Sequence, residues 1–300
     1  MAILITGISG FVGRNLQSYL IKYSKEEISD LDLRTRWLEK IKTDTNTIVH
    51  LAGKAHDLLN SSHPDEYYKI NFDLTCKVYD AFLKSNAKCF IFVSSVKAVA
   101  DRIEGTLDET ITPHPETHYG KSKLMAEEYI MQQPLPKGKN FYILRPCMIH
   151  GPGNKGNLNL LYRFIQRGIP YPLAAFDNKR SFLSVENLCF VIKEIISSNK
   201  VPSGIYHIAD DEALSTNELI TLLARSLGKN PKLWIISKSI IRKLAWIGDK
   251  LRLPLNSERL NKLTENYIVS NEKIKKVLLL ELPIQSSEGI IITANSFNNG

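Results

Sequence analysis

The chain has 300 residues, of which 43% are hydrophobic and 23% are charged, and this ordinary globular composition excludes wholesale disorder and a collagen-like repeat. Its net charge of +8 suits an anionic ligand. Because no zinc finger, aromatic RNA-binding signature or basic heptad is present, the sequence favours a small phosphate-bearing ligand over nucleic acid.

The start of the chain and its reactive side chains give three further expectations. The sequence opens on an apolar, strand-like segment, without the basic and apolar regions of a signal peptide. Its four cysteines form no CxxC pair, and its histidines have no metal-ligand spacing. No uncharged apolar run reaches the roughly 18 residues of a membrane-spanning helix. We therefore expect a cytoplasmic protein with reduced thiols, no metal site and no integral membrane segment.

Short apolar strands alternate with helical patterns through the first half of the chain. The expected strands are Ala2–Thr6, Glu27–Leu33, Thr47–Ala52, Cys89–Ser94 and Asn140–Arg145. The expected helices between them are Phe11–Tyr23, Tyr67–Ser85 and Tyr119–Gln132. This alternation predicts an α/β fold with a parallel sheet that helices cover on both faces.

The pattern becomes irregular beyond residue 150. Helices are expected at Asn157–Arg167, Val185–Ser197, Thr216–Leu227 and Ile240–Leu251, with short strands near Ser181–Leu183 and Ile205–Ala209. We therefore expect one domain over residues 1–150, to which some later segments return, and a smaller, mostly helical domain over residues 151–300. The two parts should share one cleft.

A glycine-rich turn lies between the first strand and the first helix. Gly7, Gly10 and Gly13 have the spacing GxxGxxG, and Phe11 and Val12 fill its last interval. Glycine is needed where a strand turns sharply into a helix and where a phosphate approaches the backbone. The helix N-terminus adds free N–H groups and a partial positive charge. The turn predicts a dinucleotide-binding domain at residues 1–150, with these five residues against the cofactor.

An acidic residue follows at the end of the second strand. Asp32 lies 19 residues beyond Gly13, where a carboxylate is expected to bind the adenosine ribose hydroxyl. It would repel a 2′-phosphate, which favours NAD over NADP. Arg34 could accept that phosphate, so NADP stays possible, and Asp30 is a competing acid. The alternative is a solvated strand-end carboxylate.

Three side chains predict proton-transfer chemistry. Tyr119 and Lys123 are four residues apart and therefore share a helix face. A phenol has a pKa of about 10, which a nearby ammonium should lower. Ser95 ends the fourth strand and should point into the crevice at the carboxyl edge of the sheet. We expect Ser95, Tyr119 and Lys123 to be the catalytic residues, Tyr119 being the general acid/base.

At this point the sequence resembles a known family, the extended short-chain dehydrogenase/reductases of the nucleotide-sugar epimerase/dehydratase type. The matching segments are TGISGFVG at 6–13, IVHLAG at 48–53, Asn71, the catalytic residues, LRP at 144–146, HGPG at 150–153 and RSFLSV at 180–185. The resemblance implies a Rossmann doubly wound parallel sheet with a smaller, mostly helical C-terminal substrate-binding domain.

The resemblance also assigns ligand-binding residues. In addition to the residues of the glycine turn, Asp32 and Arg34, the resemblance implies cofactor contacts for Leu51, Ala52, Gly53, Asn71, Val93, Tyr119, Lys123 and Pro146. It implies substrate contacts for Lys97, Asn157, Arg180 and Arg259. The chain departs from the family at Ala100, His150 and Asn187, where glycine, tyrosine and aspartate are common. Val96 and Lys97 replace the acid pair that follows the serine in 4,6-dehydratases, which argues against water elimination.

The implied function is an NAD(P)-dependent 4-epimerase or 4-keto-reductase that acts on a UDP-hexose or UDP-N-acetylhexosamine in surface-polysaccharide synthesis. The sequence does not separate epimerisation from reduction, and a homodimer is possible. The alternative is a non-catalytic, dinucleotide-binding regulator on the same fold.

One basic amphipathic segment, residues 238–252, allows two interpretations. Ile240, Ile241, Leu244, Ile247 and Leu251 can form one apolar stripe. We favour a helix of the substrate domain with a solvated basic face, and the alternative is a helix on an anionic membrane surface.

Overall fold

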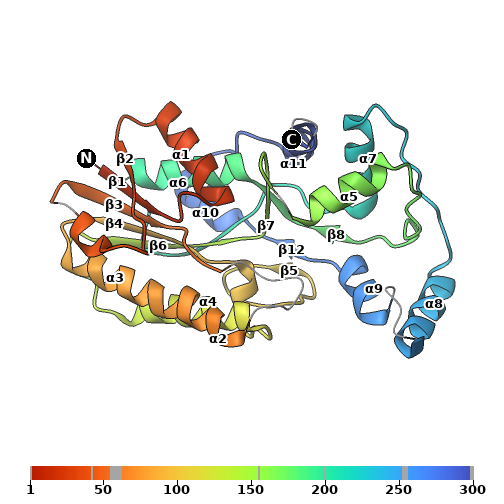
Figure 1. Cartoon of the computed structure of the whole chain (residues 1–300), viewed down its shortest axis with the longest axis horizontal. Helices are drawn as coiled ribbons and strands as arrows, with labels where there is room; N and C mark the ends of the chain where they lie inside the picture. The colour runs from red at the N-terminus through yellow and green to blue at the C-terminus, as the bar shows by residue number, and fades with distance from the viewer. Residues whose placement is uncertain are drawn as a thin grey trace.

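The computed structural model describes residues 2–41, 43–54, 63–154, 156–198, 200–251 and 256–297. Its centre is a six-stranded parallel sheet with the strand order β10-β6-β4-β3-β1-β2 (Figure 1). The strands are β1 (Ala2–Thr6), β2 (Glu27–Asp30), β3 (Thr45–His50), β4 (Cys89–Val93), β6 (Asn140–Pro146) and β10 (Gly204–Ile208). The sheet and its flanking helices form the predicted Rossmann fold.

Helices cover both faces of the sheet (Figure 1). One face carries α1 (Phe11–Tyr23) and α6 (Val185–Ser197), which pack together. The other carries α2 (Pro64–Tyr67), the π-helix η2 (Tyr68–Asp73), α3 (Leu74–Lys84) and α4 (His118–Gln132). Because successive strand residues point to opposite faces, Ile3 and Ile5 join the core under α1 and α6, whereas Leu4 joins the core under α3 and α4. Burial on both faces explains the uninterrupted apolar strands.

Two predicted strands are wrong at their carboxyl ends, for a common reason. The predicted strand Glu27–Leu33 stops at Asp30, because the chain turns where the Thr35 N–H donates to the Asp32 carbonyl over 3.3 Å. The predicted strand Thr47–Ala52 stops at His50, because the next two N–H groups donate to the Thr6 hydroxyl. The last ladder bonds run from Leu31 to the Ile5 carbonyl and from Leu51 to the Thr6 carbonyl, and beyond them a turn and the Thr6 hydroxyl take over at the edge where ligands bind in such sheets.

The second half of the chain contributes small sheets and a separate helical core. The two-stranded pairs are β12 (Ile268–Val269) with β5 (Thr106–Leu107), β7 (Met148–His150) with β9 (Phe182–Ser184), and β8 (Lys179–Arg180) with β11 (Leu214–Ser215). The helices are α5 (Asn157–Gln166), α7 (Thr216–Ser226), α8 (Lys238–Leu251), α9 (Ser257–Thr264), α10 (Glu272–Leu278) and α11 (Ser286–Ser296). Short 3-10 helices are η1 (Trp37–Lys40) and η3 (Val96–Ala98).

The helical core of this half packs around α5, α7 and α11, with Tyr162, Leu219 and Ile290 among its buried residues. The chain returns to the main sheet through α6 and β10. Helices α8 and α9 pack on each other and lie at the far end from β2, at the lower right of Figure 1. The predicted helix starting at Ile240 begins two residues earlier, at Lys238.

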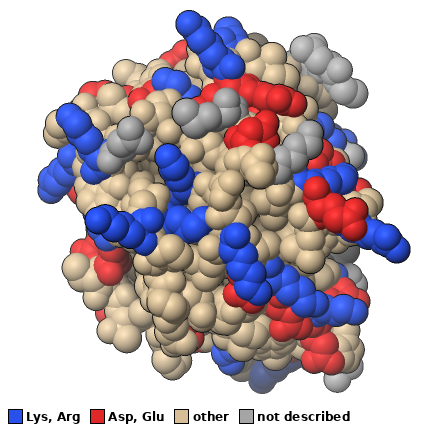
Figure 2. Space-filling view, turned by 90° about the vertical axis from the view of Figure 1, so that its left-hand side faces the viewer, with Lys and Arg blue, Asp and Glu red and all other residues tan. Residues whose placement is uncertain are grey.

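The surface at the β2 end carries charges of both signs. Figure 2 shows Lys and Arg side chains interspersed with Asp and Glu on this face, without one continuous basic stripe. Within the described ranges, no helix is long and apolar enough to cross a membrane. The same residues contain no group of three His, Cys, Asp or Glu side chains arranged to hold a metal ion.

Candidate active site

The glycine turn after β1 fits closely against its neighbours. Gly7 has a φ of +69°, and a Cβ there would lie 2.9 Å from the backbone of Ala52. A Cβ on Gly13 would lie 2.4 Å from the Gly7 carbonyl oxygen. Gly10 is the N-cap of α1, so no side chain caps this helix, and its first turn has no acidic residue. The first turn of α1, which includes Phe11 and Val12, therefore presents backbone N–H groups that suit an anion.

A buried hydrogen-bond chain fixes the end of β3 beside this turn. The Thr6 hydroxyl accepts the N–H groups of Leu51 and Ala52 over 3.1 and 3.0 Å, and lies 2.7 Å from Nδ1 of His50. Nε2 of His50 lies 3.0 Å from the Thr75 hydroxyl. Burial lowers the pKa of His50 to about 3, so its ring is neutral. Because the Thr75 hydroxyl donates its proton to the Asn71 carbonyl over 2.7 Å, it accepts from Nε2 of His50, and Nδ1 accepts from Thr6. Leu51 and Ala52 are thus held at the edge of the predicted cofactor site.

Asn71 connects β3 to the catalytic helix. Its Oδ1 accepts the Lys54 N–H over 2.7 Å, and its Nδ2 donates to the Lys54 carbonyl and the Ser122 hydroxyl, each over 3.1 Å. Ser122 in turn donates to the carbonyl of Tyr119 over 2.8 Å. A Cβ on Gly53 would lie 3.2 Å from Nζ of Lys123. Asn71 belongs to the π-helix η2, a kind of irregularity that often marks functional sites.

The structure brings Ser95, Tyr119 and Lys123 together. Ser95 directly precedes η3, and Tyr119 lies in the first turn of α4, whose N-cap Thr117 accepts the Gly120 N–H over 3.2 Å. A Cβ on Gly120 would lie 2.3 Å from the Lys97 carbonyl, so only glycine lets η3 approach α4 this closely.

The protonation behaviour of Tyr119 differs from the prediction. Burial raises the pKa of Tyr119, and a hydrogen bond from Ser95 acts against that rise. The predicted lowering by Lys123 is wrong, because the Lys123 ammonium donates instead to the Val93 carbonyl over 3.1 Å and lies over the Phe92 ring. Burial lowers the pKa of Lys123 itself to about 8.

Glu127 is a residue of this site that the sequence analysis missed. It is fully buried and accepts hydrogen bonds from Nε of Arg145, at 3.1 and 3.0 Å, and from the Ser94 hydroxyl. These contacts join α4 to the ends of β6 and β4, where Pro146 and Val93 are the last residues. Its spacing could have indicated this residue from the sequence, because Glu127 follows Lys123 by four residues and so shares its helix face.

Asp32 and Arg34 are already paired with each other. Oδ1 of Asp32 accepts hydrogen bonds from the Arg34 backbone N–H over 3.1 Å and from Nε of Arg34 over 2.8 Å. Oδ2 of Asp32 accepts one from Nη2 of Arg34 over 3.2 Å. These hydrogen bonds hold the pKa of Asp32 below its usual range. Asp32 is therefore ionised, and lies just beyond β2 with Arg34 extending into solvent.

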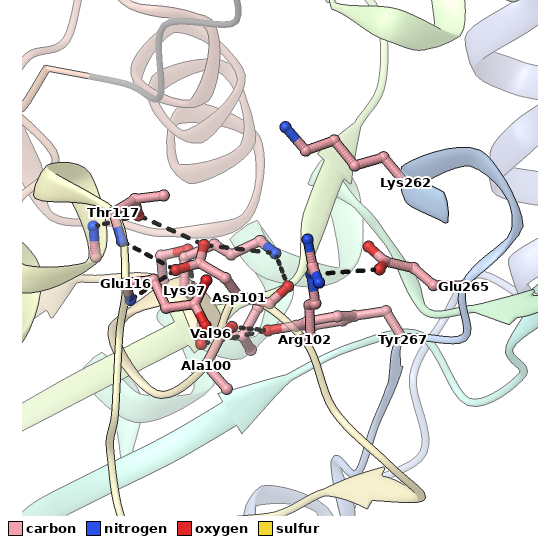
Figure 3. Close-up of polar contacts among 12 residues, drawn as sticks. Val96, Lys97, Ala100, Asp101, Arg102, Glu116, Thr117, Lys262, Glu265 and Tyr267 are labelled. Carbon is pink, nitrogen blue, oxygen red and sulfur yellow. Dashed lines mark hydrogen bonds and ion pairs between the residues drawn. The ribbon is translucent and has the colours of Figure 1, made fainter. Parts of the chain in front are cut away.

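Three of the four predicted substrate residues lie in the second half of the chain, and one of them joins Lys97 in a basic cluster. We define this basic cluster as Lys97, Arg102, Arg180 and Lys262. Arg102 and Arg180 lie 4.0 and 3.3 Å from the Glu265 carboxylate, whereas Lys262 pairs with Glu258 over 2.7 Å. Figure 3 shows Lys97, Arg102 and Lys262 around the segment of Glu265 and Tyr267. Lys97 donates to the Asp101 carbonyl over 2.8 Å and lies over the Tyr267 ring. Arg180 donates to the carbonyls of Lys262 and Glu265 and to the Glu265 carboxylate.

The remaining two predicted substrate residues are not members of this cluster. Arg259 is exposed on α9, the helix whose last turn contains Lys262. Asn157 is the first residue of α5, and its side chain lies outside the described part of the chain. The sequence analysis missed Arg102 and Asp101, since loop positions after η3 carry no motif. Asp101 accepts the N–H groups of Glu116 and Thr117 over 2.8 and 3.1 Å.

Comparison with known proteins agrees with this geometry. The model of the NAD-dependent epimerase/dehydratase family matches residues 3–209. A UDP-glucose 4-epimerase of Vibrio cholerae is 30% identical over 99% of the chain and 95% of that protein. The N-acetyl-alpha-D-glucosaminyl-diphospho-ditrans,octacis-undecaprenol 4-epimerase of Escherichia coli O157:H7 is 30% identical over 91% of the chain and 84% of that protein. The NAD complex of the Thermus thermophilus UDP-glucose 4-epimerase superposes with a TM-score of 0.76 at 19% identity, covering 100% of both chains.

Proposed function

The chain belongs to the NAD-dependent epimerase/dehydratase family, and from this premise we propose that it transfers hydride between NAD and C4 of a nucleotide-linked hexose. The observation that carries the proposal is that Ser95 and Tyr119 are hydrogen-bonded partners at the carboxyl edge of the sheet, while Lys123 lies against Gly53, next to the Ala52 that packs on Gly7. A regulator without activity would have no need to keep a partly buried phenol hydrogen-bonded to a serine.

The residues around the turn fit NAD. The N-terminus of α1 and the close-packed Gly7 and Gly13 would hold the pyrophosphate, and Asp32 would accept the adenosine ribose hydroxyls. Leu51, Ala52, Gly53, Val93 and Pro146 would border the rest of the cofactor. Lys123 reaches this side of the site and would hold the nicotinamide ribose. When bound, the oxidised nicotinamide supplies a hydride acceptor and a positive charge.

The chain's own groups would move the proton. For this step Tyr119 would have to be ionised, which the Ser95 hydrogen bond favours against the effect of burial and the positive charge of the bound nicotinamide would favour further. The Tyr119 phenolate would then accept the proton of the sugar C4 hydroxyl while hydride leaves C4 for the nicotinamide and a C4 carbonyl forms. Ser95 donates a hydrogen bond to the same sugar oxygen and keeps it within reach of Tyr119. In the reverse direction Tyr119 returns the proton. Glu127 and Asn71 act as positioning residues, because they hold α4 against the strand ends.

The basic cluster would bind the diphosphate of the substrate. Arg180 and Lys97 come from different parts of the chain: Arg180 pairs with Glu265 over 3.3 Å, and Lys97 donates to the Asp101 carbonyl over 2.8 Å. Arginine suits phosphate because its planar fork makes paired, charge-assisted hydrogen bonds. We propose a UDP-hexose or UDP-N-acetylhexosamine as substrate and the cytoplasm as the location of the enzyme. We also propose a homodimer, for which exposed Met125 and Met131 on α4 supply apolar surface.

The test is to incubate the purified protein with UDP-glucose or UDP-N-acetylglucosamine and no added NADH, and to separate the sugars by chromatography. We expect the C4 epimer to form without net use of cofactor. Product that forms only from a 4-keto sugar with stoichiometric NADH would make the enzyme a reductase. If neither reaction occurs in a screen of UDP-sugars with both cofactors while NAD still binds, the chain is a regulator and the proposal is wrong.

A further inference from the structure

Helix α8 turns an apolar stripe toward solvent. Its buried side is formed by Ile241, Ala245 and Gly248. A second stripe has exposed fractions of 53% at Ile240, 48% at Leu244, 40% at Ile247 and 64% at Leu251. These positions follow the spacing i, i+4, i+7 and i+11, so they form one continuous face. The predicted helix is present with its basic side chains exposed, and of the five stripe residues named from the sequence only Ile241 is buried.

The exposed apolar surface extends beyond the stripe. Trp234 and Ile235, just before the helix, have exposed fractions of 57% and 82%, and Trp246 on the helix has 55%. We call the four residues of the stripe the α8 face, near which these three further apolar residues are exposed. A contiguous apolar face of this kind marks an interaction surface, because single exposed apolar residues are common but contiguous ones are not.

Basic residues lie beside the α8 face. Helix α8 contains Lys238, Arg242, Lys243 and Lys250, against Asp249 as its one acidic residue. Lys243 and Lys250 adjoin the stripe on the helical wheel, and Lys250 lies 3.8 Å from the centroid of the Trp246 ring. The partner must therefore be both apolar and anionic. A protein partner fits poorly, since lysine is depleted in the cores of protein interfaces.

We propose that the α8 face docks on an anionic lipid bilayer. Helix α8 has 14 residues, which span about 21 Å, too short to cross the hydrocarbon core. A helix with an apolar face and flanking lysines instead lies in the plane of the headgroups. Its lysines meet anionic lipid, and Trp234 and Trp246 have the amphipathic rings that concentrate at this boundary.

Docking in this way would place the proposed substrate site near the membrane. Helix α8 packs on α9, and the carbonyl of Lys262 near the end of α9 accepts the Arg180 guanidinium. The basic cluster is thus one helix away from the α8 face. Membrane docking does not depend on catalysis, so the inference stands or fails apart from the proposed function.

The experiment is sedimentation of the full chain with vesicles of phosphatidylcholine alone or mixed with phosphatidylglycerol. We expect binding to the mixed vesicles only, with a blue shift of tryptophan emission. The double change Lys243→Gln and Lys250→Gln should weaken binding roughly fivefold per lysine. The double change Leu244→Ser and Ile247→Ser should weaken it at least about tenfold, because the apolar area no longer gains from leaving water.

The matched control is Ile21→Ser with Leu279→Ser, two exposed apolar residues outside the α8 face, which should leave vesicle binding unchanged. Circular dichroism and urea denaturation without vesicles check that every variant is folded. Absence of binding to mixed vesicles overturns the proposal. So does a dimer, seen by light scattering, that Leu244→Ser with Ile247→Ser converts to monomers, because the α8 face would then be an interface between copies of the chain.

Discussion

The carboxyl edge of the central sheet and the α8 face differ in where they put polar and apolar atoms. At the sheet edge, polar groups are buried and satisfied, as in the chain from Thr6 through His50 to Thr75. At α8, apolar side chains such as Leu244 and Leu251 are exposed beside lysines. The first arrangement is costly to disturb because each buried group depends on its partners. Changes to the exposed side chains of α8 should alter the free energy of unfolding little, which is typical of a surface that binds a partner.

The largest effect should come from Tyr119→Phe. This change keeps the packing of the ring but removes the proton that is transferred, so kcat should fall roughly 10²–10⁴-fold with NAD affinity nearly unchanged. The measurement is steady-state epimerisation together with NAD titration. Tyr129→Phe, on the same helix and hydrogen-bonded to Asp80, is the matched control and should retain its activity.

The pH dependence of the reaction should sharpen the same assignment. The Ser95 hydrogen bond lowers the pKa of Tyr119, so Ser95→Ala should move the limb for its ionisation to higher pH. Near wild-type turnover by Tyr119→Phe, or an unmoved limb in Ser95→Ala, would remove Tyr119 from the mechanism.

Next in size is Glu127→Ala. It leaves the Arg145 guanidinium buried without its carboxylate, and breaking such a pair costs about 3–5 kcal/mol in the free energy of unfolding. Urea denaturation measures this loss. The neighbouring Glu128 is exposed, and Glu128→Ala should change stability by less than about 0.5 kcal/mol. Equal effects of the two changes would contradict the assigned role of Glu127.

A smaller effect is expected for Asp32→Ala. Losing a charge-assisted hydrogen bond to the ribose costs about 1.5–3 kcal/mol, so NAD should bind about tenfold more weakly or worse. The change also removes the carboxylate that pairs with the Arg34 guanidinium, which should reduce the ratio of the affinity for NAD to the affinity for NADP. Calorimetric titration with both cofactors measures this. If Asp30→Ala has the stronger effect, Asp30 is the ribose-binding acid.

The smallest effect on folding should come from the α8 face. Leu244→Ser and Ile247→Ser should each change the free energy of unfolding by no more than about 0.5 kcal/mol, because both side chains already contact solvent. Ile241→Ala, on the buried side of the same helix, should cost about 2 kcal/mol or more. If Leu244→Ser were as destabilising as Ile241→Ala, the α8 face would be part of the core.

The sequence predicted the sheet edge much better than the α8 face. Glycines and the Tyr119–Lys123 spacing have fixed structural meanings, so the turn and the catalytic helix were predicted within a residue or two. Glu127 was not predicted, because the sequence does not distinguish a buried carboxylate from an exposed one when its partner Arg145 is unknown. At α8, periodicity showed that Leu244 and Ile247 share a face, but it contains no information about what covers that face. The direction of the Tyr119 pKa likewise depends on burial, which spacing does not reveal.

The contacts of Arg180 also bear on the kind of ligand that the proposed substrate site would bind. The Arg180 guanidinium already donates to two carbonyls and to the Glu265 carboxylate. Two residues after Glu265, the Tyr267 hydroxyl donates to the Ala100 carbonyl (Figure 3). A neutral free sugar brings nothing that Arg180 lacks and cannot displace these partners. A diphosphate brings two adjacent negative charges and can compete with one carboxylate. On the proposed function, we therefore expect Arg180 to favour diphosphate-linked sugars over free hexoses.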